Sequence, residues 1–224
     1  EAVVREHKPV MFYTIPTFQN PTSWVSGVEV RRRIAELAAE FDMLVIEDDP
    51  YAALRFSGEK LPTIKSFDTS DNVIVLTSFS KTISPGLSVA LCFGSKDLIR
   101  KMTIAKQGID THSPNLNRAI VAEYLNRGFM PKHIEHISGV YSRSARIMTD
   151  AMAEHFPEWV HFEQPVGGLF IWCTLPEGWD ANEIFKRAVE RKVAFVPGAP
   201  FFTTPGKGQN TFRLNFSAEP EERI

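Results

Sequence analysis

The sequence predicts an α/β fold: part of a large domain, with a mostly parallel sheet and flanking helices, followed by a small C-terminal α+β domain. Short apolar runs alternate with helical patterns through the first half of the chain, as in a sheet whose strands are joined by helices. Two of these runs, Met43–Glu47 and Val73–Ser78, are continuously apolar over most of their length, as parallel strands covered on both faces tend to be. We therefore expect the large-domain part at residues 1–137 and the small domain at residues 138–224.

The first half of the chain is expected to contain four strands and a capped helix. The first strand is predicted at Val10–Ile15 and the fourth at Leu87–Phe93, on either side of the two apolar runs. Between the first two strands, Ser26 and Glu29 form an S-x-x-E capping box, which predicts a helix that runs to about Phe41.

Helical patterns follow Ser95 and predict three helices, at Asp97–Gly108, Asn115–Gly128 and Pro131–Phe156. The last of these is long enough to connect the two domains.

The expected small domain begins with a strand at Gly168–Thr174. A helix opened by Asp180, with Glu183 in the capping position, then precedes strands at Val193–Val196 and Thr211–Phe216. In the last strand apolar and polar residues alternate, so Arg213 should point away from the core.

Composition excludes several classes of protein. Hydrophobic residues make up 43% of the 224 residues, and the net charge is −2, so neither a disordered chain nor a nucleic-acid or membrane-surface partner is expected. Cys92 and Cys173 each lie in an apolar run and are expected to be buried thiols in a reducing, cytoplasmic compartment. The chain begins without Met, and Ser217 resembles a helix start that does not continue, which suggests a piece of a longer protein.

Polar residues follow three of the predicted strands. Ligands bind beyond the carboxyl ends of strands in open α/β sheets, and the candidates there are Asn20, Asp48, Tyr51, Ser78, Ser80 and Lys81. Each alone has an ordinary structural explanation: a solvated lysine, a turn carboxylate, a packing tyrosine. Their combination is what points to a site.

The motifs that contain these residues resemble those of fold-type-I pyridoxal-phosphate aminotransferases, in the family's order. The segments are IPTFQNPT at Ile15–Thr22, EDDPY at Glu47–Tyr51, SFSKTISPGL at Ser78–Leu87 and NTFRLNFS at Asn210–Ser217. The chain is most similar to the group of 2-aminoadipate aminotransferases and MocR-type regulators.

The resemblance implies a pyridoxal 5'-phosphate cofactor, amino acid and 2-oxo acid substrates, and a homodimer. It assigns Lys81 to the Schiff base and to transfer of the Cα proton, Asp48 to the pyridine nitrogen, and Tyr51 with Asn20 to the ring oxygen. Ser78 and Ser80 would bind the phosphate, and Arg213 and Asn20 would bind the substrate, with Arg213 on its α-carboxylate.

Two positions depart from the family's wording. Ser88 stands where the family has an arginine that pairs with the phosphate, and Ser23 stands where NPTG has glycine. Loss of that arginine would weaken cofactor binding by about one to two orders of magnitude. The family's glycine-rich phosphate loop and stacking aromatic are also not found in this sequence.

Two other functions remain open at this stage. The chain could be the ligand-sensing domain of a MocR-type transcription regulator, or an inactive truncated fragment. No metal site is expected, because His133 and His136 lack a third ligand and are expected to be solvated helix histidines. Arg31–Arg33 is expected to form a polar helix face and not a nucleic-acid patch.

Overall fold

The computed structural model describes all residues from Glu1 to Ile224, which divide into two compact units. Unit 1 comprises Glu1–Thr17, Val25–Ala53 and Glu59–Glu135, and unit 2 comprises Phe18–Trp24, Leu54–Gly58 and His136–Ile224. The domain boundary between residues 137 and 138 stays a prediction.

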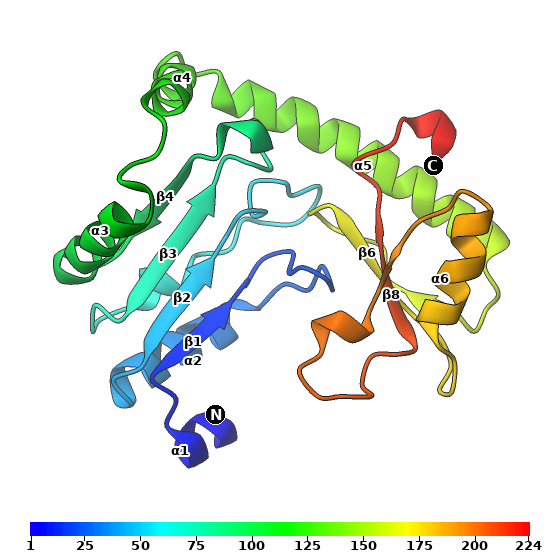
Figure 1. Ribbon diagram of the computed structural model, residues 1–224, viewed down its shortest axis with the longest axis horizontal. Helices are drawn as coiled ribbons and strands as arrows, with labels where there is room; N and C mark the ends of the chain where they lie inside the picture. The colour runs from blue at the N-terminus through cyan, green and yellow to red at the C-terminus, as the bar shows by residue number, and fades with distance from the viewer. The chain divides into compact units, whose positions relative to one another are not determined.

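Unit 1 is built on a four-stranded sheet (Figure 1). The strands lie in the order β1-β2-β3-β4: β1 (Met11–Thr14), β2 (Leu44–Asp48), β3 (Val73–Ser78) and β4 (Ala90–Phe93). The pairs β1–β2 and β2–β3 are parallel, whereas β4 runs antiparallel to β3. The expected α/β fold with a mostly parallel sheet is thus confirmed.

One face of this sheet carries the main core of unit 1. Helix α2 (Val28–Glu40) contributes Ala35 and Ala38 to a buried cluster with Val45 of β2 and Val73 of β3. Burial alternates along β2, with Val45 and Glu47 fully buried and their neighbours half-buried. The expectation that β2 is covered on both faces is therefore wrong.

Helix α2 does not start as the sequence suggested. Its N-cap is Gly27, and no side chain accepts a hydrogen bond there. Ser26 is buried, and its backbone N–H donates to the carbonyl of Pro16 at 2.9 Å. The expected capping box is wrong because the chain turns at Ser26 to meet the loop after β1, one residue before the helix.

The other helices of unit 1 are α1 (Ala2–His7), α3 (Lys96–Asp110) and α4 (Asn115–Asn126). Ser95 caps α3 by accepting from the backbone N–H of Leu98. Helix α1 has no counterpart among the sequence predictions.

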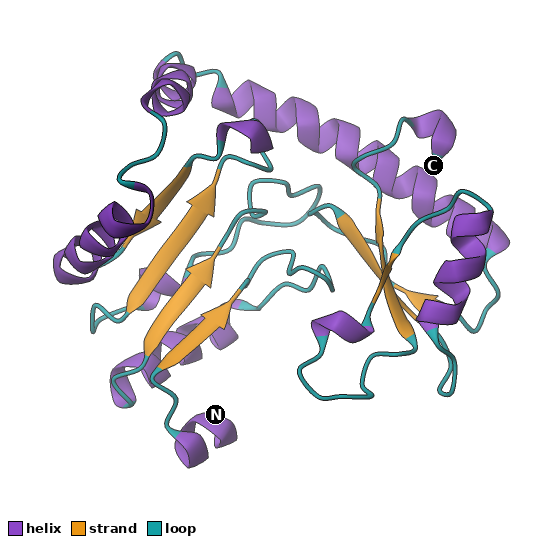
Figure 2. Ribbon diagram, viewed as in Figure 1, coloured by secondary structure: helices purple, strands orange, loops and turns teal.

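Unit 2 contains an antiparallel sheet in the order β5-β6-β8-β7 and helix α6 (Figure 2). Its strands are β5 (His161–Phe162), β6 (Phe170–Thr174), β7 (Val196–Pro197) and β8 (Thr211–Asn215). Helix α5 (Met130–His155) begins in unit 1 and continues into unit 2.

Most expectations for unit 2 match its elements. Asp180 caps α6 (Ala181–Glu190) by accepting from the backbone N–H of Asn182 at 2.8 Å, as expected. Strand β7 lies later than expected, β5 was not anticipated, and Ser217 starts no helix because it donates to Asn215 in a local turn.

The core of unit 2 gathers around β6 and β8. Ile171, Cys173, Phe212 and Phe216 are buried together. Cys173 is buried as expected, but Cys92 on the edge strand β4 is only half-buried. None of the helices has the length and apolarity needed to cross a membrane.

Candidate functional site

At the carboxyl end of β2, the adjacent acidic residues Glu47 and Asp48 lie on opposite faces of the sheet. Glu47 is fully buried and accepts hydrogen bonds from the backbone N–H groups of Ile64 at 2.9 Å and Lys65 at 3.0 Å. Burial raises the pKa of Glu47, although the two N–H donors oppose that shift. Because side chains alternate along a strand, Asp48 lies on the other face.

Asp48 is held by a tyrosine that the sequence analysis did not single out. The hydroxyl of Tyr13, on β1, donates to Oδ2 of Asp48 at 2.5 Å. Burial and this hydrogen bond raise the pKa of Tyr13 to about 12. Tyr51, which is 6% exposed, lies near enough to contribute to the same shift. Asp48 and Tyr51 are thus brought together, with Tyr13 as a third member.

Asp49 is a second enclosed carboxylate of this segment. Burial raises its pKa, the backbone N–H of Ala52 opposes the shift, and Oδ1 is buried without a hydrogen-bond partner. No group of three or more His, Cys, Asp or Glu side chains is placed to hold a metal ion.

Lys81 lies in a tight turn after β3. The carbonyl of Phe79 accepts from the backbone N–H groups of Thr82, Ile83 and Ser84 at 2.7 to 3.3 Å, which closes the turn around Lys81. Phe79 itself is anchored in a small core with Val89. Lys81 is exposed and no carboxylate pairs with it, so its amine is available to a ligand.

Helix α5 also supports this turn. Nε2 of His133 lies 2.7 Å from the carbonyl oxygen of Thr82, which requires the ring N–H to donate. The expectation that His133 is a solvated helix histidine is therefore wrong. The sequence carries no signal for this hydrogen bond, because 51 residues separate the partners.

The serines after β3 lie beside the same turn. Ser78 Oγ accepts from the backbone N–H of Ser80 at 3.1 Å and keeps its own hydroxyl proton for donation. Because β2 and β3 are parallel, with Asp48 in register with Leu76, the carboxyl ends that bear Asp48 and Ser78 lie at one edge of the sheet. Ser88 is exposed and has a positive φ of 50°.

Asn20 and Arg213 belong to unit 2, and the structure brings them together. Nη1 of Arg213 donates to Oδ1 of Asn20. The guanidinium lies 4.1 Å from the ring centre of Phe170 and 5.4 Å from that of Phe201. Two aromatic faces and an amide oxygen thus fix the orientation of the planar donor fork.

Arg31 is a correction to the sequence analysis. It was expected on a polar helix face with Arg32 and Arg33, but it is only 2% exposed. Its guanidinium donates to the carbonyl oxygens of Ser26, Pro62 and Pro16 and to the hydroxyl of Thr17. It ties α2 to the loop after β1.

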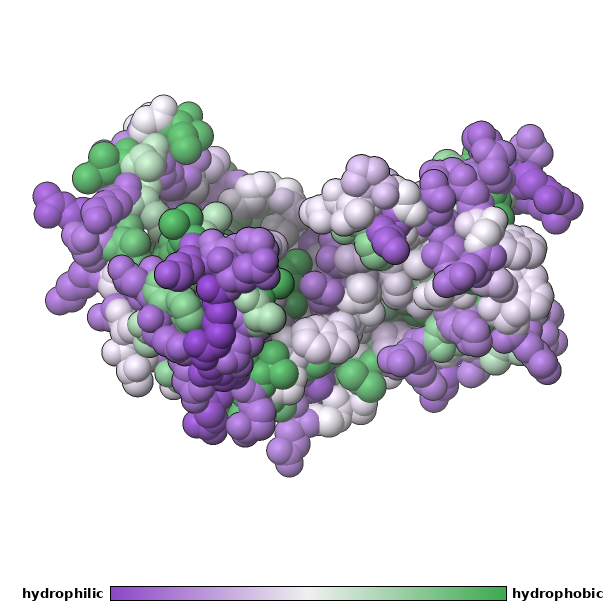
Figure 3. Space-filling view, turned by 90° about the horizontal axis from the view of Figure 1, so that it is seen from below, coloured by the Kyte–Doolittle hydropathy of each residue, from purple (hydrophilic) through white to green (hydrophobic).

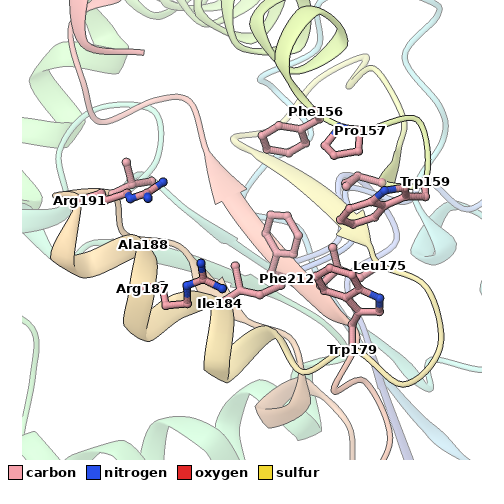
Figure 4. Close-up of a pocket in the computed structure, with 12 residues that line it drawn as sticks. Phe156, Pro157, Trp159, Leu175, Trp179, Ile184, Arg187, Ala188, Arg191 and Phe212 are labelled. Atoms are coloured by element: carbon pink, nitrogen blue, oxygen red, sulfur yellow. The ribbon is translucent and has the colours of Figure 1, made fainter.

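A groove of about 410 Å³ lies elsewhere in unit 2 (Figure 4). Trp159 and Trp179 lie at one end of it, Arg187 projects from α6, and Arg191 follows the last residue of that helix. None of the residues predicted from the sequence as site residues lines it. The groove is therefore separate from the candidate site.

Apolar side chains are also exposed on the surface, where Figure 3 shows hydrophobic and hydrophilic residues intermixed on one face. On the edge strands β1 and β4, Met11, Tyr13 and Phe93 are each more than half exposed.

Comparison with known proteins identifies related sequences along the whole chain. A family profile described as "Aminotransferase class I and II" matches residues 4–224. Aromatic-amino-acid aminotransferase 1 of Thermococcus litoralis is 40% identical over 221 residues, which are 98% of this chain and 53% of the relative. The 2-aminoadipate transaminase of Thermus thermophilus is 39% identical over 227 residues, 100% of this chain and 57% of the relative.

Solved structures agree with these relatives. The alpha-aminoadipate aminotransferase of Thermus thermophilus, solved with N-(5'-phosphopyridoxyl)-L-leucine, superposes with a TM-score of 0.91 at 38% identity. The match covers 99% of this chain and 58% of that one. The chain thus spans little more than half the length of the relatives it matches.

Proposed function

Because the chain belongs to the class I and II aminotransferase family, we propose that it is part of a pyridoxal-phosphate-dependent aminotransferase. The reaction moves an amino group from an amino acid to a 2-oxo acid. The observation that carries the proposal is the arrangement in unit 1, where Asp48 and the Ser78–Lys81 turn follow two neighbouring parallel strands.

The donor set of unit 1 suits pyridoxal phosphate. A carboxylate with one oxygen bonded and the other open suits a protonated ring nitrogen, and serine hydroxyls suit a phosphate. An exposed lysine without an acidic partner suits an aldehyde carbon. When bound, the cofactor supplies an electron sink for the charge left on the substrate's Cα.

Lys81 has two roles in this proposal. Its amine would hold the cofactor, and as a free amine it would take the proton from the substrate's Cα and return it to the carbon that receives the amino group. The turn closed by Phe79, and held at Thr82 by His133, keeps Nζ in one place for both steps.

Asp48 holds a proton on the ring nitrogen, and Tyr51 donates to the ring oxygen. Ser78 and Ser80 donate to the phosphate. The resemblance assigns Asn20 to the ring oxygen of the cofactor. The hydrogen bond from Arg213 to Asn20 supports a second role for Asn20, in which it orients the Arg213 side chain.

Arg213 binds the substrate's α-carboxylate through its fork of donors. Replacing it with lysine keeps the charge but removes the two parallel hydrogen bonds, so we expect Arg213→Lys to raise KM about tenfold to a hundredfold. The measurement is transamination kinetics with aromatic amino acids and 2-aminoadipate as donors, because the relatives' names point to these substrates. An unchanged KM would contradict the assignment.

The homodimer and the cytoplasmic location stay predictions. Analytical ultracentrifugation of the chain with and without pyridoxal phosphate tests whether it forms a homodimer.

A further inference from the structure

The hydrogen bond between Tyr13 and Asp48 links a residue of β1 to the proposed cofactor carboxylate of β2. Tyr13 pairs in register with Ile46, two residues before Asp48. Both side chains therefore stand on the same face of the sheet. The phenol reaches diagonally across that face to Oδ2, at 2.5 Å.

The bond leaves the carboxylate with one oxygen occupied and the other open. The hydrogen bond from Tyr13 is to Oδ2 of Asp48, and the residue is half-buried rather than enclosed. A carboxylate with no such donor rotates about its last bond, whereas one held at Oδ2 presents Oδ1 in a fixed direction. A ligand N–H that approaches Oδ1 of Asp48 therefore meets a carboxylate oxygen whose direction is already fixed.

Tyr13 contributes little to the packing of unit 1. Its side chain is 53% exposed on an edge strand, and it belongs to none of the buried clusters. Its polar end is instead bonded to the one carboxylate of this segment that faces the proposed site.

We propose that Tyr13 is a positioning residue that holds Asp48 at Oδ2 so that Oδ1 is directed to the ring nitrogen of pyridoxal phosphate. The inference rests on the proposed function. Tyr13 does not touch the cofactor in this account and acts only through Asp48. An ionised carboxylate directed at the ring nitrogen is what would keep that nitrogen protonated.

The first test needs no cofactor. The chain has four tyrosines, Tyr13, Tyr51, Tyr124 and Tyr141, so ring-labelled tyrosine gives four NMR signals that can be assigned by single Phe variants. Tyr13 is expected to titrate near pH 12, above the ordinary value of 10.0. Asp48→Asn should lower that value by removing the negative acceptor. A Tyr13 signal that titrates near 10 and ignores Asp48→Asn would overturn the inference.

The second test measures the cofactor. Tyr13→Phe is expected to weaken binding of pyridoxal phosphate about tenfold, which corresponds to ~1.4 kcal/mol. It should also move the nitrogen resonance of ring-labelled cofactor toward the unprotonated form. Asp48→Asn should produce the same shift to a larger extent. Tyr141→Phe is the matched control, because Tyr141 packs against the buried cluster of unit 2.

The outcomes separate the two proposals. If the parent chain binds cofactor on Lys81 while Tyr13→Phe matches it in affinity and in the nitrogen resonance, the positioning role is wrong and the proposed function stands. If the parent chain binds no pyridoxal phosphate, both are wrong.

Discussion

Ser88 stands where the resemblance to the family places an arginine that pairs with the cofactor's phosphate. It ends the short 3₁₀ turn Pro85–Leu87 with a positive φ of 50°. We expect Ser88→Arg to tighten binding of pyridoxal phosphate about tenfold to a hundredfold, because a charged hydrogen bond to the phosphate is worth ~1.5–3 kcal/mol. The dissociation constant is measured by absorbance titration.

Ser88→Gln is the control, because it adds length and donors without charge under the same backbone strain. Equal affinities for the serine, glutamine and arginine forms would show that this position does not face the phosphate.

At the residue scale, motif spacing singled out the candidate site residues, while contacts between residues distant in sequence could not be predicted. Asp48 and Lys81 could be named because they follow strands within recognisable segments. Tyr13 could not, because its partner lies 35 residues away on the neighbouring strand. Arg31 was misassigned for a related reason: a triplet of arginines gives no indication of which member faces the core, and the carbonyl groups that bind it are set by the loop after β1.

At the scale of elements, the turn before β6 packs closely against Phe18, and this packing requires a glycine at position 167. A Cβ there would lie 2.0 Å from Cζ of Phe18, which is fully buried and cannot move aside. We expect Gly167→Ala to lower the free energy of unfolding by at least ~1–3 kcal/mol through overpacking. Chemical denaturation checks the value.

Gly139, also in unit 2, has open space where Gly167 has none. It lies exposed in helix α5, and no atom of another residue lies within 4 Å of the place that a Cβ would take there. Gly139→Ala should therefore raise the free energy of unfolding by about 0.5–1 kcal/mol. Equal effects of the two substitutions would contradict the packing described for Phe18.

The loop that leads into β3 depends on one carboxylate. Burial raises the pKa of Asp68, but hydrogen bonds from Lys65, Ser70 and the backbone N–H of Val73 outweigh it and lower the pKa to about 2. Because the pKa of Asp68 is lower in the folded state, the unfolded chain binds more protons in this pH range. The contribution of ionised Asp68 to the free energy of unfolding is therefore full above the ordinary pKa of 3.8 and is lost as pH falls toward 2.

We expect Asp68→Asn to cost about 1–2 kcal/mol at neutral pH, with the difference from the parent chain shrinking toward pH 2. Asp71→Asn is the control on the same loop, because that carboxylate is exposed and lies 3.6 Å from Lys65. A penalty at Asp68 that does not change with pH would contradict the charge-based account. Urea denaturation over a pH series measures both.

Whether a segment forms a helix or a strand was predicted more successfully than the residue at which it begins or ends and how far it is buried. Apolar runs located β2 and β3, and Asp180 located the start of α6. The start of α2 was misplaced because Ser26 is fixed by the loop after β1 and not by the helix. Most residues of the edge strand β1 are exposed although the segment is apolar.

For the whole molecule, order along the chain carried most of the information. Four motifs in the family's order identified the family, and the alternation of strand and helix predicted the mostly parallel sheet that the structure contains. The amino acid substrate could not be predicted, because a shared α-carboxylate clamp does not distinguish one side chain from another. The function is therefore proposed at the level of the reaction.

The central claim is that Lys81 carries the cofactor. The most direct measurement is to incubate the chain with pyridoxal phosphate, reduce with borohydride and locate the covalent adduct by peptide mass spectrometry. The account predicts a single adduct on Lys81 that is absent from Lys81→Ala and weakened in Asp48→Asn. An adduct spread over surface lysines, or unchanged in Lys81→Ala, would contradict it.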